Sequence, residues 1–226
     1  MAKTIIIADD HPLFRTAMQA ALGQVLENPA VYEAGTIAEL QNIMDQGHSP
    51  DLILLDLHMP GAHGLSGLIF LRGQHPNIPV AIVSATEDAG VIKRAIHHGA
   101  SGFIPKSLPM ETMNEAINTL LSGAKWLPPE LSSLPDDEVK APDIESRLAS
   151  LTPQQFRVLG MISEGLLNKQ IAFELEVSEA TIKAHVTAIF KKLGVRSRTQ
   201  AVIAIQELEI EPPSSETNSG NTEGPQ

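Results

Sequence analysis

The sequence predicts two domains of different fold class, a doubly wound α/β domain followed by a small all-α domain. Short, continuously apolar runs alternate with amphipathic segments five times within residues 1–122, whereas only helical spacing occurs from residue 150 to 210. Strands that are apolar on both faces are expected in a parallel sheet with helices covering each side. Residues 123–149 contain four prolines and an acidic cluster. We interpret them as a linker that cannot hold a regular helix.

The first domain is expected to contain five strands, each followed by a helix. The apolar runs that indicate strands are residues 5–8, 31–34, 52–55, 80–84 and 102–104. Helical spacing is found at residues 12–26, 36–46, 64–73, 88–98 and 109–122. In the first of these segments Leu13, Ala17 and Ala21 recur every four residues, and Pro12 suits a first helical turn.

The second domain is expected to contain four helices, because its boundary signals are clear. Thr152 and Gln155 form a capping box around Pro153, and Asn168 and Ser178 are expected to cap the next two helices. The third helix should end at Gly194, and a second capping box over residues 197–200 should open the last helix. Two short helices, a turn and a longer helix predict a helix-turn-helix. The polar tail, residues 211–226, is expected to be disordered.

Composition narrows the classes of protein. The chain of 226 residues is 42% hydrophobic and 19% charged, and it contains no cysteine. This excludes a disulfide scaffold, a thiolate metal site and a cysteine nucleophile. The N-terminus lacks the pattern of a signal peptide, and no apolar run approaches the ~20 residues of a membrane span. We expect a cytoplasmic protein without membrane contact.

Charge is distributed unevenly along the chain. The net charge is −11, yet residues 150–210 contain 7 basic and 6 acidic side chains, against 6 and 12 in residues 1–122. An evenly spread charge of −11 would argue against binding to nucleic acid, but the helical domain does not share the acidic character of the rest of the chain.

Polar side chains stand at the ends of four predicted strands. Asp9 and Asp10 follow the first strand, Asp56 the third, Ser84 ends the fourth, and Lys106 follows the fifth. In open α/β sheets, ligands bind outside the carboxyl ends of the strands. Converging acids require a cation, and oxygen ligands suit Mg²⁺. One carboxylate could then accept a phosphoryl group, with the lysine and the hydroxyl holding its oxygens. Taken singly, each residue also fits a helix cap, a turn or the solvated surface.

The long helix of the second domain has two distinct faces. Its apolar stripe should face the core; opposite it lie small, cationic and hydroxyl side chains suited to approach DNA closely, although such a face is also typical of a solvated helix. The stripe consists of Ile182, Val186, Ile189, Phe190 and Leu193, and the outer face of Ala180, Lys183, Ala184, Thr187, Ala188 and Lys191.

Four short motifs of the first domain resemble those of bacterial response-regulator receiver domains. They are DD at 9–10, DLHMPG at 56–61, SA at 84–85 and FIPKS at 103–107, and the resemblance spans residues 3–122. It implies the strand order 2-1-3-4-5 and phosphorylation of Asp56 by a sensor histidine kinase. It also implies Mg²⁺ held by Asp10 with help from Asp9, by Asp56 and by the His58 backbone carbonyl.

The same resemblance assigns roles around the phosphoryl group. Ser84 and Lys106 would contact its oxygens, and Phe103 stands at the position of an aromatic switch, although it could equally be an ordinary core residue. Many receivers carry proline directly after this lysine, whereas here Pro105 precedes it. The isomer of the Ile104–Pro105 bond therefore stays open.

Residues 151–202 are similar to LuxR/NarL-type DNA-binding domains along their whole length, so the chain as a whole resembles a NarL/FixJ response regulator. The resemblance implies that a homodimer binds double-stranded DNA, with a dimer surface that could instead be core. The implied base-facing residues are Lys183, Ala184 and Thr187; the residues near phosphates are Thr181, Lys169 and Lys191; the dimer candidates are Val202, Ile205 and Leu208.

The expected function is phosphorylation-controlled regulation of transcription in a bacterial two-component system, with no enzymatic activity beyond slow self-dephosphorylation. We expect the unphosphorylated first domain to shield the recognition helix until phosphorylation acts through Ser84 and Phe103. Two alternatives stay open. One is a constitutive DNA-binding regulator with an idle receiver. The other is an aspartate-based phosphohydrolase, which would need an acid where His58 stands.

Overall fold

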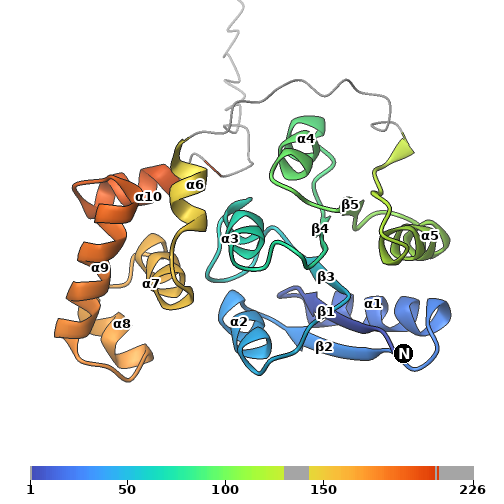
Figure 1. Ribbon diagram of the computed structural model, residues 1–226, viewed down its shortest axis with the longest axis horizontal. Helices are drawn as coiled ribbons and strands as arrows, with labels where there is room; N and C mark the ends of the chain where they lie inside the picture. Colours follow the sequence, from blue (N-terminus) through green and yellow to red (C-terminus); the bar gives the residue numbers. More distant parts are fainter. Residues whose placement is uncertain (1, 130–142, 207, 209–226) are drawn as a thin grey trace, which may run out of the picture.

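A five-stranded parallel sheet organises the N-terminal domain (Figure 1). The computed structural model describes residues 2–129, 143–206 and 208. The strand order is β2-β1-β3-β4-β5, with each pair of neighbours parallel, which confirms the predicted fold class. The strands are β1 (Thr4–Ala8), β2 (Ala30–Ala34), β3 (Leu52–Leu55), β4 (Val80–Ser84) and β5 (Gly102–Pro105).

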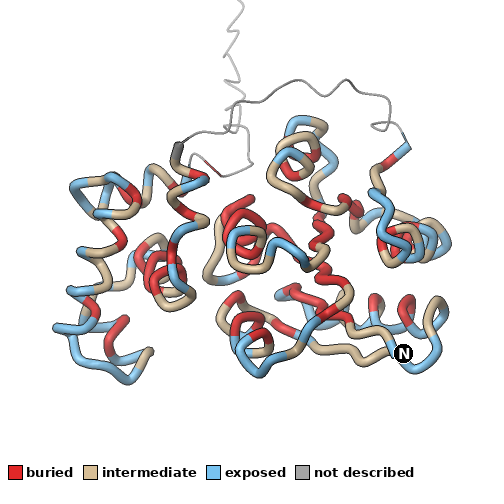
Figure 2. Tube along the Cα trace, viewed as in Figure 1, coloured by how far each residue is buried: buried red, intermediate tan, exposed pale blue. Residues whose placement is uncertain are grey.

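Five helices cover the two faces of this sheet. The alternating residues of β1 explain why: Ile5 and Ile7 belong to an apolar cluster with α1 and α5, whereas Ile6 belongs to a second cluster with α2, α3 and α4. Red, buried segments run along the strands and the inner helix faces in Figure 2. The helices are α1 (Pro12–Val25), α2 (Ile37–Asp45), α3 (Ser66–Gln74), α4 (Ala89–His97) and α5 (Met110–Leu121).

The region expected to be a linker is more structured at both ends than its composition indicated. Trp126 forms a parallel bridge with Gly102, which extends the sheet beyond β5. At the other end lies a helix, α6 (Asp143–Ala149), so the expectation that residues 123–149 hold no regular helix is wrong. The last of the four prolines, Pro142, lies just before α6, and the segment after it buries Leu148. Residues 130–142 and the tail at 211–226 lie outside the described residues.

The C-terminal domain consists of helices α6 to α10. Thr152 and Gln155 form the predicted capping box, because each side chain accepts from the other residue's backbone N–H. Gly194 ends α9 in the left-handed region at φ 72°, as predicted. The helices after α6 are α7 (Pro153–Ser163), α8 (Asn168–Glu174), α9 (Glu179–Leu193) and α10 (Arg198–Gln206).

Two predicted caps differ in the structure. The N-cap of α8 is Leu167, whose backbone N–H donates to Gln170 Oε1 at 2.7 Å; Asn168 is the first helical residue. Before α10, Ser197 Oγ accepts from the Gln200 backbone N–H, but Gln200 Oε1 accepts from the Arg196 backbone N–H instead of completing the box. At both helix starts a glutamine side-chain oxygen accepts from a backbone N–H that precedes the helix.

No helix in the described part of the chain is both long enough and apolar enough to cross a bilayer.

The capping box gives a stability prediction. Thr152→Ala removes the hydroxyl that accepts from Gln155, and we expect it to destabilise the C-terminal domain by about 1 kcal/mol. Thermal or urea unfolding of the full chain measures this. Thr152→Ser keeps the hydroxyl and serves as the control. An unchanged midpoint for Thr152→Ala would show that the cap does not limit stability.

Candidate functional site

Two carboxylates and one ammonium meet at the carboxyl edge of the sheet. Lys106, after β5, places Nζ 2.6 Å from Asp9 Oδ2 and 2.9 Å from Asp56 Oδ2. Asp9 follows β1 and Asp56 follows β3, and both side chains are only 2% exposed. Three strands that are separate in sequence therefore deliver their terminal charges to one buried point, as the parallel topology requires.

The lysine is held charged in this pocket. Burial of the ammonium opposes its charge, but its hydrogen bonds to Asp9 and Asp56 prevail and raise the pKa of Lys106 above the usual value. Nζ also lies 4.8 Å from the centre of the Phe14 ring, a distance typical of a cation–π contact. Lys106 therefore stays a fixed positive charge at any physiological pH.

The donors at this edge fit a divalent cation. Asp9, Asp10, His11 and Asp56 each offer one ligand atom, and these atoms lie within 4.8 Å of one another. Asp56 Oδ1 is buried and has no hydrogen-bond partner, so one oxygen of the buried carboxylate is available to a ligand. Carboxylate oxygens are the ligands that Mg²⁺ prefers. The three predicted acids thus lie together, while His11 was not predicted as part of the cluster; its position directly after two acids was the available signal.

The two residues predicted as a switch lie deep in the domain. Ser84 is fully buried at the end of β4, and its Oγ accepts from the Thr86 backbone N–H at 3.3 Å. Phe103 is also fully buried, in the cluster that holds α2, α3 and α4. The Ile104–Pro105 bond is trans, and the Lys106 backbone N–H donates to the Ser84 carbonyl at 2.8 Å. This bond ties the ends of β4 and β5 together beside the pocket.

Helix α9 shows the two faces expected from its sequence. Ile182, Ile189 and Leu193 are buried, and the partly buried Val186 and Phe190 pack against the same cluster. On the opposite side, four candidate DNA-contact residues are exposed: Lys183, Ala184, Thr187 and Lys191. We call these four residues the outer face of α9.

Among the described residues, the interactions of this outer face are local. Lys183 Nζ lies 2.9 Å from Glu179 Oε1, and Thr187 Oγ1 donates to the Lys183 carbonyl. Thr181 and Lys169, the other candidates, are exposed as well, and Thr181 Oγ1 lies 2.8 Å from Ser178 Oγ. A surface ion pair of this kind contributes little, so the Lys183 ammonium can exchange Glu179 for a phosphate at low cost.

Arginine at the start of α10 has a structural role. The Arg198 guanidinium donates to the carbonyls of Ile162 and Leu166, which closes the C-terminal end of α7. Burial lowers the pKa of Arg198 from its usual value. This side chain is therefore committed within the domain, whereas Arg196 is exposed.

The three residues predicted to form a dimer surface differ in how far they are buried. Ile205 and Leu208 are each 4% exposed, and Val202 is partly buried; Ile203 between them is 49% exposed. The Leu208 carbonyl accepts from the backbone N–H of Leu65, the N-cap of α3. In this arrangement the N-terminal domain occupies the end of the segment predicted to contact a second copy.

The two domains pack against each other through α3 and α6 (Figure 1). The rings of Phe70 and Phe156 stack with centroids 4.2 Å apart, and Gln74 Nε2 donates to the carbonyls of Ala149 and Leu151. One apolar cluster runs without a break from the α2–α4 side of the sheet into α6, α7, α9 and α10. The contact is therefore a shared core and not a few surface bonds.

A buried polar pair completes this contact beside α4. His98 Nε2 lies 3.1 Å from Glu145 Oε1, and neither side chain is more than 9% exposed. Burial lowers the pKa of His98 to about 4 and raises that of Glu145. The imidazole is therefore neutral near pH 7, and the contact with Glu145 is a hydrogen bond and not a pair of opposite charges.

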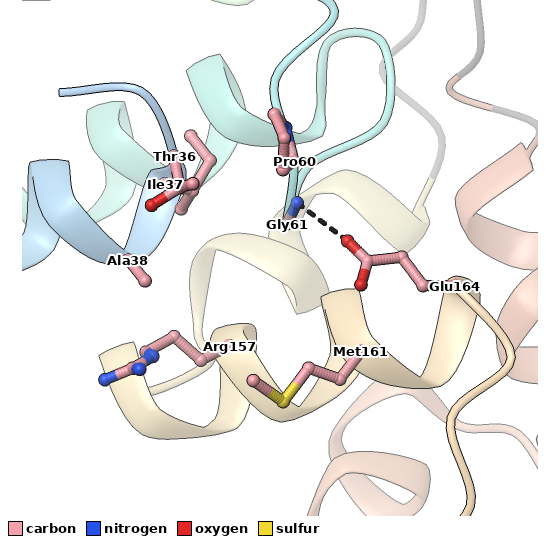
Figure 3. A pocket seen from close by; sticks show the side chains of 8 residues that line it. All are labelled: Thr36, Ile37, Ala38, Pro60, Gly61, Arg157, Met161 and Glu164. Atoms are coloured by element: carbon pink, nitrogen blue, oxygen red, sulfur yellow. Dashed lines mark hydrogen bonds between the residues drawn. The ribbon is translucent and has the colours of Figure 1, made fainter. Parts of the chain in front are cut away.

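A pocket open to solvent lies where the loop after Asp56 meets α7 (Figure 3). Glu164 Oε1 accepts from the Gly61 backbone N–H at 3.0 Å, which bridges the two domains. A Cβ added to Gly160 would lie 2.5 Å from the Gly61 carbonyl oxygen, so α7 approaches this loop more closely than a side chain allows. The loop that starts at the buried carboxylate is thus held directly by the C-terminal domain.

The expectation that the N-terminal domain shields the recognition helix is wrong for this arrangement. The domain contact uses α6, α7 and the end of α10, while the outer face of α9 is exposed. The physical reason is that α6 and α7 offer large apolar residues for burial, such as Leu148 and Phe156, whereas the only apolar residue of the outer face is the small Ala184.

Comparison with known proteins divides the chain into the same two domains. A family model for response regulator receiver domains matches residues 5–118, and one for bacterial regulatory proteins of the luxR family matches residues 149–205. The glycerol metabolism activator of Pseudomonas putida is 42% identical over 215 residues, covering 91% of this chain and 96% of that protein. The nitrate/nitrite response regulator NarL of Escherichia coli K12 is 31% identical over 209 residues, covering 92% and 96%.

Among solved structures, RcsB of Salmonella enterica serovar Typhimurium, bound to promoter rprA in the presence of phosphomimetic BeF3⁻, has the same fold. It matches with a TM-score of 0.54 at 23% identity and covers 91% of this chain and 99% of that one. The matches to sequence and to structure extend over both domains. The chain therefore belongs to the NarL/LuxR family of DNA-binding response regulators, in which a receiver domain precedes a helix-turn-helix domain.

Proposed function

We propose that this protein is a transcriptional regulator of a two-component system in which a sensor histidine kinase phosphorylates Asp56. The observation that carries the proposal is that Lys106 pairs with the buried carboxylates of Asp9 and Asp56, with one oxygen of Asp56 left without a partner. An Asp56 oxygen would attack the phosphorus of a phosphohistidine, so that the P–N bond breaks, an acyl-phosphate P–O bond forms, and the released imidazole takes up a proton.

The surrounding residues have complementary tasks in this transfer. Asp9, Asp10, Asp56 and the His58 backbone carbonyl would hold Mg²⁺, which supplies neutralisation of the phosphoryl charge. Lys106 is already within reach of the phosphoryl position, and its ammonium would pair with an oxygen of the new group. Ser84 would donate its hydroxyl to another oxygen, and Phe103 would follow its movement inward.

The output would be sequence-specific binding to promoter DNA by a homodimer in the cytoplasm. The outer face of α9, together with Thr181 and Lys169, would contact bases and phosphates. The related structure of RcsB is described as bound to promoter DNA, which supports this use of the C-terminal domain. Because this domain is close to neutral, a single copy would bind weakly, and two copies on paired half-sites would gain affinity through effective concentration.

Phosphorylation would act on the domain contact as well as inside the receiver. The segment from Asp56 to Gly61 connects the acceptor to the hydrogen bond with Glu164. A new group on Asp56 that shifts this loop would disturb that bond and the close contact with Gly160. The docked and released arrangements would then be two states whose balance phosphorylation changes. Release would free Leu208 and permit the two copies to align on DNA.

The acceptor assignment is tested by Asp56→Asn. An amide cannot form an acyl phosphate, so incubation with acetyl phosphate and Mg²⁺ should give no phosphorylated protein by intact-mass spectrometry. Asp45→Asn, at an exposed acid near the end of α2, should label like the wild type. Labelling of Asp56→Asn at the wild-type level would remove the assignment.

The domain contact is tested by Gly73→Ala. A Cβ at Gly73 would lie 2.7 Å from Ala149 Cβ and 2.9 Å from the Ala149 carbonyl, although alanine itself favours helix α3. We expect the unphosphorylated variant to show a larger radius of gyration in solution scattering and tighter DNA binding than the wild type.

Gly23→Ala is the matched control, because a methyl group added to this helix glycine would meet no atom within 4 Å apart from its chain neighbours and the backbone of its own helix. If Gly73→Ala leaves both size and DNA affinity unchanged, the contact does not restrain the protein. Equal DNA affinity of the wild type with and without BeF3⁻ would favour the constitutive alternative instead.

The DNA-contact assignment is tested by Lys183→Ala. With genomic fragments selected by the wild-type protein, we expect affinity in fluorescence anisotropy to fall about fivefold or more. If the ammonium contacts a phosphate, the slope of log K against log salt should also decrease by about one. Lys125→Ala, at an exposed lysine outside the C-terminal domain, is the control. Wild-type affinity in Lys183→Ala would place this face of α9 away from DNA.

A further inference from the structure

The metal cluster contains a nitrogen atom as well as oxygens. His11 Nδ1 lies 2.6 Å from Asp10 Oδ1 and 3.2 Å from Asp9 Oδ1. In an octahedral site with metal–ligand distances of ~2.1 Å, adjacent ligand atoms are ~3.0 Å apart and opposite ones ~4.2 Å. The two measured distances are close to those of adjacent ligands, and the whole cluster fits within 4.8 Å. A small contraction would bring these atoms around one ion.

The backbone fixes His11 in this position. Its N–H donates to Asp9 Oδ1 at 2.8 Å, and its carbonyl accepts from the backbone N–H groups of Phe14 and Arg15 at the start of α1. The Arg15 guanidinium in turn donates to the Asp9 carbonyl at 2.7 Å. The turn from Asp9 to α1 is therefore closed by four hydrogen bonds, and the imidazole projects beside the two acids without a costly rearrangement.

The exposure of the ring suits a ligand. The His11 side chain is 65% exposed, whereas Asp9 and Asp56 are buried. Nδ1 faces the acids, and the rest of the ring is open to solvent, so Nε2 can carry the proton while Nδ1 offers its lone pair. Asp56 Oδ1, buried and without a partner, supplies the independent sign that a ligand belongs here.

We propose that His11 is a metal ligand and that it makes this pocket selective for first-row transition-metal ions over Mg²⁺, compared with a pocket of oxygen ligands alone. The proposal rests on the metal site of the proposed function. Magnesium prefers oxygen, whereas imidazole binds first-row transition-metal ions with affinities that rise from Mn²⁺ through Co²⁺ and Ni²⁺ to Cu²⁺ and fall again at Zn²⁺. The ion that accompanies phosphorylation would therefore depend on the residue after the acid pair.

The test is pulsed EPR of the full chain loaded with Mn²⁺, which reports directly on nitrogen bound to the ion. We expect ¹⁴N coupling in the wild type, its loss in His11→Ala, and its retention in His97→Ala. His97 is the matched control, because it is an exposed histidine at the end of α4 and lies outside the metal cluster. Asp10→Asn should weaken Mn²⁺ binding, which places the ion in this pocket.

Displacement of bound Mn²⁺ by a second metal ion measures the selectivity of the site. The concentration of Ni²⁺ needed for displacement should rise in His11→Ala, because Ni²⁺ loses more affinity than Mn²⁺ when the imidazole is removed. The concentration of Mg²⁺ needed should fall, because Mn²⁺ loses its nitrogen ligand and Mg²⁺, which prefers oxygen, loses little. Bound Mn²⁺ without nitrogen coupling, or coupling that persists in His11→Ala, would overturn the proposal and leave the metal site intact. Failure of the wild type to bind Mn²⁺ at all would overturn both the proposal and the metal site.

Discussion

The ion triplet of Lys106, Asp9 and Asp56 is the constraint on which the rest of the receiver depends. Two carboxylates that are each only 2% exposed repel each other at close range and require a compensating cation. The lysine provides it from a third strand, so the ends of β1, β3 and β5 are held at one point. The same charge that permits the acids to be buried is the charge that a phosphoryl group on Asp56 would attract. Lys106 therefore stabilises the pocket before phosphorylation and would also bind the phosphoryl group.

From this pocket a short, continuous path leads to the domain contact. The chain that leaves β3 at Asp56 reaches Gly61 five residues later, where Glu164 of α7 accepts its N–H. It then enters α3, whose Phe70 ring stacks on Phe156. Coupling between sites needs an element that both sites contact and that has two arrangements. The β3–α3 segment meets the first requirement directly. Under the proposed function, this route would run beside the one through Ser84 and Phe103 and would not replace it.

Sequence patterns predicted the fold and the converging charges well, because both follow from local rules. Apolar runs of β3 and β4 define strands buried on two faces, and the parallel topology then places Asp9, Asp56 and Lys106 at one edge. The domain contact could not be predicted in this way. Helix α6 follows a proline-rich stretch whose composition conceals it, and its burial of Leu148 depends on α3, which is distant in sequence. Periodicity shows which face of a helix is apolar, but it does not show which other element that face packs against. For the same reason the sequence could not decide the role of Ile205 and Leu208, because their spacing fits a dimer surface and a core equally.

The exposure of the α9 outer face while the domains are docked changes how control can work. A receiver that covered the recognition helix would regulate by occlusion, but here the docked domain presents Lys183 and Thr187 to solvent. The contact between the two domains fixes the position of α9 relative to the receiver. Helix α6 packs on α3, and Arg147 of the same helix donates to the Leu193 carbonyl at the end of α9. The recognition helix is therefore rigidly attached to a receiver some of whose contacts also occupy Leu208. If the protein binds paired half-sites as a dimer, as proposed, restricting the orientation of α9 and occupying Leu208 would weaken binding while the proposed DNA-contact residues stay exposed. In this family member, regulation by tethering is thus the mechanism that the packing favours.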